Sequence, residues 1–187
     1  MRLNSVHRHL CRTRNGAPAD VEQLGSGQLE SMRKRLIAET SDIVRPRVED
    51  WLDVERTAVV EVTSEDKDHP VEYVFSPTEA AGWRAATPGV QTIRLVFDQP
   101  QRLKRISLIF EENQAARTQE FVLRWSSDGK SFREIVRQQW TFSPPQTVRE
   151  TEKYQVELSD VTVLELIILP NISGGMTRAS LKSWRLA

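Results

Sequence analysis

The sequence lacks several features that would assign it to a familiar class. Its 187 residues include one cysteine, Cys11, so no disulfide can form within the chain. No run approaches the roughly 18 apolar residues of a membrane span, and the N-terminus has no apolar signal core. The formal net charge is +0, from 26 basic and 26 acidic residues, which disfavours nucleic acid as a partner. These absences predict a cytoplasmic protein without a membrane span.

Marks of catalysis are also missing. The sequence has three histidines, and two of them, His7 and His9, lie beside Cys11 near the N-terminus. This cluster has the wrong spacing for a known zinc finger and lacks a fourth ligand. No Gly-x-Ser-x-Gly, phosphate-binding loop or His-Glu-x-x-His motif occurs. We therefore expect no catalytic residues, no metal site and no cofactor.

The composition that remains, 39% hydrophobic and 28% charged, suits one globular core with an appendage. Residues 1–27 carry four arginines before the first acid and predict a flexible basic tail. Residues 28–54 predict a helical extension, because apolar positions recur at helical spacing from Leu29 to Ile37. This helix either packs on the following domain or mediates oligomerisation.

Residues 55–187 have the period-2 alternation of β-strands, with turn signals between short extended runs. The pattern predicts an all-β, antiparallel β-sandwich of the jelly-roll type. Asp128-Gly129 predicts a tight turn that joins two strands of one hairpin. A further turn is expected at residues 98–101. The predicted strands cover residues 57–63, 92–97, 103–110, 121–125, 131–135, 154–158, 163–169 and 181–186.

Several landmarks occur together in a fixed order. They are Gly82-Trp83, the strand at 93–97, Ser-Ser-Asp-Gly at 126–129 between two aromatic-led strands, the apolar run at 164–168 and the closing residues 179–186. In this combination, residues 55–187 resemble the discoidin family, also called the coagulation factor V/VIII type C domain. That family belongs to the galactose-binding-domain-like jelly rolls. The resemblance implies a non-catalytic binding module, often one for carbohydrate.

The resemblance also implies that the ligand is held by loops at one end of the barrel. Three segments correspond to those loops: residues 64–70, 111–119 and 171–178. In sugar-binding relatives, an acid or histidine of the first loop bonds ring hydroxyls and an Arg or Asn of the second loop donates. The ligand-binding residues that this implies are Glu65, Asp68, His69, Glu111, Asn113, Arg117 and Arg178.

Two elements of that family's pattern are missing here. Gly175-Met176 stands where an aromatic side chain would stack on the sugar. The family's Asp-Gly-Asp calcium turn is absent, although Glu65, Asp66 and Asp68 offer oxygen ligands for structural calcium.

Two functions therefore remain open, glycan binding through the loops and an intracellular role in protein–protein interaction or oligomerisation on the same fold. Trp140 and Phe142, beside Pro144-Pro145, are candidate partner-contact aromatics.

Overall fold

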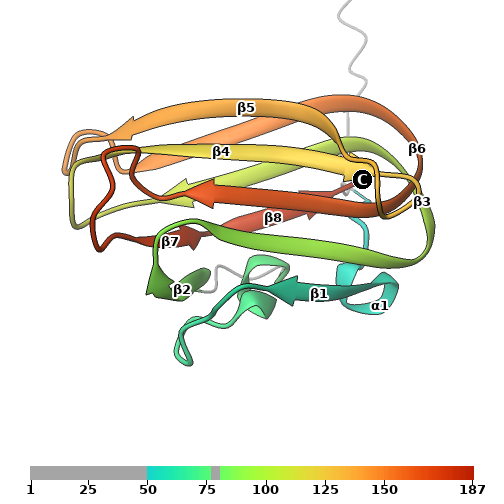
Figure 1. Cartoon of the computed structure of the whole chain (residues 1–187), viewed down its shortest axis with the longest axis horizontal. Helices are drawn as coiled ribbons and strands as arrows, with labels where there is room; N and C mark the ends of the chain where they lie inside the picture. Colours follow the sequence, from blue (N-terminus) through green and yellow to red (C-terminus); the bar gives the residue numbers. More distant parts are fainter. Residues whose placement is uncertain (1–49, 77–80) are drawn as a thin grey trace, which may run out of the picture. The chain divides into compact units, whose positions relative to one another are not determined.

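The computed structural model describes residues 50–76 and 81–187 of the chain. The predicted tail at 1–27, its His7, His9 and Cys11 cluster and most of the predicted helical extension lie outside these residues. Within them the chain is built almost entirely from strands (Figure 1). The elements are α1 (Val54–Thr57), β1 (Ala58–Val62), η1 (Val71–Val74), β2 (Trp83–Pro88), β3 (Gln91–Glu111), β4 (Arg117–Ser126), β5 (Arg133–Phe142), β6 (Arg149–Leu169), β7 (Arg178–Leu181) and β8 (Ser183–Leu186).

The predicted antiparallel β-sandwich is confirmed. Five strands pair in the order β1-β3-β6-β4-β5, β8 pairs with β3, and β2 pairs with β7 in a separate two-stranded sheet. All of these pairings are antiparallel. The four long strands β3, β4, β5 and β6 run along the sandwich, and β3 and β6 both curve round one of its ends (Figure 1).

β3 and β6, of 21 residues each, contribute to both layers. The first part of β3 pairs with β1 and with the last part of β6, whereas the second part of β3 pairs with β8 and with the first part of β6. The register between them shifts where they bend, between Val96 and Arg105. The turn predicted at 98–101 is wrong, because β3 bends there and continues as one strand.

Alternation along the strands builds the core. Ile93, Leu95 and Phe97 point inward from β3, and Phe121 and Leu123 do so from β4. The segment of β6 from Val163 to Leu166 is buried on both sides, and its one charged residue, Glu165, is paired with Arg94 and Arg124. No described helix is long and apolar enough to cross a membrane.

The hairpin predicted at Asp128-Gly129 is confirmed, since β4 and β5 pair across it. Asp128 Oδ1 accepts hydrogen bonds from the backbone N–H groups of Ser131 at 2.7 Å and Lys130 at 2.8 Å, and from Ser126 Oγ at 2.8 Å. These bonds hold the pKa of Asp128 well below its usual range. Gly129 takes φ 71°, which residues with a Cβ rarely adopt.

Two segments differ from the predicted pattern. The single closing strand predicted at 181–186 is two short strands, β7 and β8, which belong to different sheets. β2, which no alternation predicted, pairs with β7 through Trp83 and Leu181. This small sheet lies beside the loops that form the candidate site.

Candidate functional site

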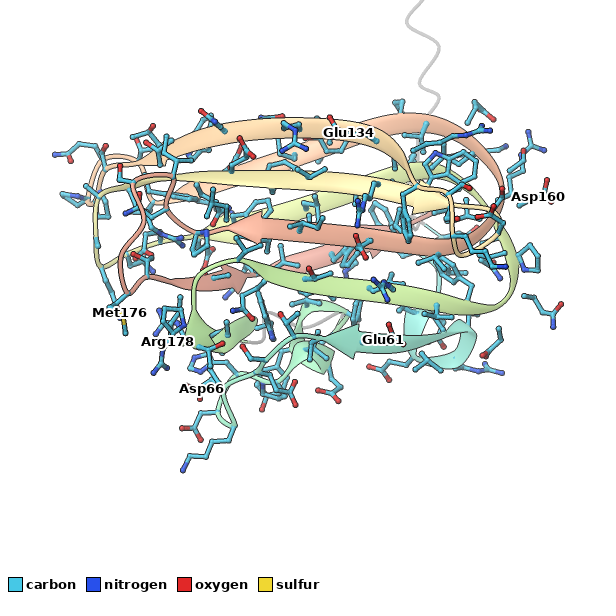
Figure 2. The ribbon with its side chains drawn as sticks, viewed as in Figure 1. Glu61, Asp66, Glu134, Asp160, Met176 and Arg178 are labelled. Atoms are coloured by element: carbon cyan, nitrogen blue, oxygen red, sulfur yellow. The ribbon has the colours of Figure 1, made fainter. Side chains whose placement is uncertain are left out.

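The first and third predicted loops meet at one end of the sandwich. Figure 2 shows Asp66, Met176 and Arg178 together at this end and Asp160 at the opposite end. An ion pair joins the two loops, because Arg178 Nη1 lies 3.3 Å from Asp66 Oδ2. The backbone of β2 supports the first loop, since Asp66 N donates to the carbonyl of Arg84 at 2.8 Å.

An open groove of about 430 Å³, the loop-end groove, lies at this end. Its walls come from β2, from the loop between β3 and β4, and from the segment that enters β7. A cavity of this size is within the range of small-molecule sites. The lining residues are Arg84, Glu112, Gln114, Ala115, Met176, Thr177 and Arg178.

Arg84 is the unusual member of this set. Among the arginines that the structure describes, it alone makes no side-chain hydrogen bond, ion pair or ring contact. It is half-buried, and it lies opposite Ser180 in the β2–β7 pairing. The Arg84 guanidinium therefore lines the loop-end groove with its five donors uncommitted to other protein groups.

The two carboxylates near Arg84 are already occupied. Glu112 Oε1 accepts the backbone N–H groups of Gln114 at 2.7 Å and Ala115 at 3.3 Å, and Glu112 Oε2 accepts Arg117 Nε at 2.8 Å. Asp66 accepts the backbone N–H of Asp68 at 3.0 Å and pairs with Arg178. The Asp68 bond, and then the charges of neighbouring groups including Arg178 and Arg84, lower the pKa of Asp66.

Arg117, predicted as a ligand clamp, is buried in the wall of the sandwich and does not line the groove. Its side chain is 1% exposed and pairs with Glu112. It also donates to the carbonyl oxygen of Pro170 and lies 5.6 Å from the ring of Phe142. Burial lowers the pKa of Arg117, and the charge of Glu112 opposes that shift. Its contacts join the second loop to Pro170, which follows β6 and precedes the third loop.

The predicted residues of the first loop also lie outside the groove lining. Glu65 Oε2 accepts the backbone N–H of Val71 at 3.0 Å and so supports the start of η1. Asp68 is exposed. His69 Nδ1 is buried, lies 4.0 Å from Asp66 Oδ1 and has no hydrogen-bond partner. Of the predicted ligand-binding residues, Arg178 alone lines the loop-end groove.

The remaining predicted residues have other surroundings. Glu111 pairs with Arg149 at 2.8 Å and with Lys182 at 3.6 Å, while Asn113 is exposed beside the groove. Phe142 is fully buried, so its prediction as a partner-contact aromatic is wrong. Trp140 is half-buried and packs against the core.

Six of the seven lining residues were not predicted as ligand-binding: Arg84, Glu112, Gln114, Ala115, Met176 and Thr177. Arg84 follows the buried Trp83 in β2, and strand alternation would have placed it on the opposite face from Trp83 and Ala85. No sequence signal indicates that its guanidinium is unpaired, because pairing depends on residues distant in the chain. Within the described part, no cluster of three or more His, Cys, Asp or Glu side chains is arranged to hold a metal ion.

A second polar cluster lies between β5 and β6. Gln138 Nε2 donates to Glu152 Oε1 at 2.6 Å and to Glu150 Oε1 at 3.3 Å, and Tyr154 Oη donates to Glu152 Oε2 at 2.9 Å. Burial, together with the neighbouring Glu152, raises the pKa of Glu150 to about 8. Glu150 is therefore stabilised by holding a proton, in contrast to the paired carboxylates of the groove.

Solved structures with the same fold include carbohydrate-binding modules. A pectin binding module is 17% identical at a TM-score of 0.52, with 70% of this chain and 89% of that chain covered. The C-terminal domain of a Bacteroides fragilis chitobiase is 15% identical at 0.53, with 74% and 97% covered. The family 32 module of C. perfringens NanJ, in complex with galactose, is 10% identical at 0.51, with 70% and 97% covered. At these identities the similarity shows the fold.

A comparison with curated proteins finds no match to this chain. The family comparison does find one, because the XRCC1 N terminal domain matches residues 52–164, which is more than half of the chain. The matched segment runs from just before α1 into the apolar half of β6. The predicted galactose-binding-like jelly roll is thus confirmed, and the chain belongs to the XRCC1 N terminal domain family.

Proposed function

We propose that the chain is a non-catalytic carbohydrate-binding module whose ligand lies in the loop-end groove. The observation that carries the proposal is the convergence of Arg84, Gln114 and Arg178 from three separate segments on one open groove. Guanidinium and amide groups in such a site would donate hydrogen bonds to the hydroxyl and ring oxygens of a sugar. The carbohydrate-binding modules that share the fold support the same reading.

The apolar surface of the groove differs from that of a sugar site in which an aromatic ring stacks on the sugar. None of its lining residues is aromatic, and the exposed apolar side chain is Met176, at 83% exposure. A thioether chain contacts C–H groups without the geometric demand of a ring. Affinity would therefore rest on the polar donors more than on stacking.

The direct test is to titrate the full chain with a panel of neutral and acidic oligosaccharides, read by calorimetry. We expect at least one class to bind. The double variant Gln114→Ala/Arg178→Ala should lose that binding, whereas Arg102→Ala, whose Glu157 ion pair is largely exposed, should keep it. Absence of binding across the panel would remove the proposal.

A second function, binding of a protein partner or a second copy, has its own supporting observation. Ile172 and Met176 are exposed hydrophobic residues of the third loop, and Val90 is exposed in the adjacent β2–β3 turn. The two segments are joined because Gly89 N donates to the carbonyl of Thr177 at 3.2 Å. This bond brings the segments of Val90 and Met176 together, and exposed apolar side chains on one surface suit a protein partner. Light scattering of the full chain, with Met176→Ser as the variant, tests self-association.

A further inference from the structure

We propose that the loop-end groove selects an acidic saccharide and that Arg84 binds the carboxylate of its uronic acid residue. This inference rests on the proposed function and names the chemical class of its ligand. It starts from the balance of charge around the groove. Three arginines, Arg84, Arg117 and Arg178, stand against two carboxylates, Asp66 and Glu112.

Both carboxylates have other partners, and neither is hydrogen-bonded to Arg84. Glu112 uses one oxygen for two backbone N–H groups and the other for the buried Arg117. Asp66 is taken up by the backbone N–H of Asp68 and by Arg178. Arg84 acts on Asp66 and Arg117 through its charge but has no hydrogen-bonded contact with either. The surplus positive charge of the groove is therefore located at Arg84.

The surroundings of Arg84 make an anion the favoured occupant. The side chain is half-buried, so its charge is less screened than that of a fully exposed arginine. A planar guanidinium matches a carboxylate with two parallel hydrogen bonds, and such bonds are stronger than those to neutral hydroxyls. A neutral sugar would leave this charge without a counter-ion.

The same assignment accounts for the missing aromatic. Neutral sugars gain much of their affinity from an aromatic plate, which this groove does not contain. A uronic acid supplies an ion pair in its place, and Met176 and Ala115 cover the C–H face. The volume of about 430 Å³ accommodates a ligand of one to two sugar rings.

The test compares three probes of equal length: trigalacturonate, its fully methyl-esterified form and neutral galactotriose. Binding to the full chain is followed by calorimetry at low and at physiological salt. We expect the acid to bind at least tenfold more tightly than the ester, with the difference shrinking as salt rises. Arg84→Gln should lose at least tenfold for the acid and should weaken the neutral probe less than the acid, so that the preference for the acid falls. Arg102→Gln, the matched control, should leave both unchanged.

The possible outcomes separate the two proposals. If the ester or galactotriose binds as well as the acid, carbohydrate binding stands and the acidic assignment is overturned. If Arg102→Gln weakens the acid as much as Arg84→Gln does, the attraction is general and the role of Arg84 is overturned. If a short poly-glutamate peptide binds as tightly and with the same dependence on Arg84, the ligand class is wrong. If no saccharide binds, both proposals fall.

Discussion

Arginine serves opposite purposes on the outer face of the sheet and in the loop-end groove. On the sheet face, Glu165 is 1% exposed and is held by Arg94 Nε and Nη2, at 2.8 and 2.7 Å, and by Arg124 Nε. In the groove, the Arg84 guanidinium makes no hydrogen bond or ion pair with any described group. The first arrangement is closed and stabilises the fold, whereas the second is open to a ligand.

Arg117, which is buried against the groove residue Glu112, extends the comparison, and its loss should have the largest effect on stability. Arg117→Gln leaves Glu112 buried with two backbone donors and no counter-charge, so we expect a loss of about 3 kcal/mol in the free energy of unfolding. Urea denaturation measures it. Arg149→Gln breaks a half-exposed pair with Glu111 and should cost less than about 1 kcal/mol. Equal losses would contradict the structural role of Arg117.

Removal of the buried Glu165 carboxylate on the sheet face should cause the second-largest loss of stability. Glu165→Gln leaves Arg94 and Arg124 facing each other, but both are partly exposed and therefore partly screened. We expect a loss of about 2 kcal/mol in the free energy of unfolding. Glu61→Gln removes an exposed partner of the same Arg94 and should cost less than about 0.5 kcal/mol. A Glu165→Gln variant as stable as the parent would show that the cluster adds nothing.

Glu150 is a buried carboxylate for which the described residues provide no arginine partner. Its pKa is about 8 in the fold and near 4.5 when unfolded, so the folded state holds the proton more tightly. The stability that this provides is complete below about pH 4.5 and is lost as the pH rises through 8. Glu150→Gln should remove this dependence and exceed the parent in stability at pH 8.5 by about 1–2 kcal/mol.

The pH dependence is followed by urea denaturation from pH 5 to pH 8.5. Glu157→Gln is the control, because Glu157 is a 74% exposed carboxylate of the same strand. That variant should retain the loss of stability with rising pH that the parent shows. A parent whose stability does not fall over this range would contradict the raised pKa of Glu150.

The smallest effect on stability is expected for Arg84→Gln. Since the Arg84 side chain makes no hydrogen bond, ion pair or ring contact with the described residues, its replacement should change the free energy of unfolding by less than about 0.5 kcal/mol. Thermal unfolding without ligand measures this. A large loss would mean that Arg84 supports the fold and would place it with Arg117 and Arg94.

The strands were predictable because their signal is local. Ile93, Leu95 and Phe97 alternate with polar residues whatever surrounds them, and the Asp128-Gly129 turn carries its own hydrogen bonds. The bend at 98–101 was misjudged because the same residues that favour a turn also allow a strand to curve.

The site was less predictable, because it depends on contacts distant in sequence. Arg117 and Arg84 are indistinguishable as letters, yet one is buried against Glu112 and the other faces an open groove. The resemblance indicated the end of the sandwich at which the loop-end groove lies and one of its lining residues, Arg178. It did not identify which arginine remains available to a ligand.

The two long strands have a consequence for how the molecule comes apart. β3 and β6 each supply one part of their length to either layer, and the two parts are joined through a bend. Because both layers share these two strands, one layer cannot unfold while the other keeps β3 and β6 complete. Partial unfolding of a single layer is therefore disfavoured. Release of the core should therefore be all-or-none, with both layers losing their strands in one transition.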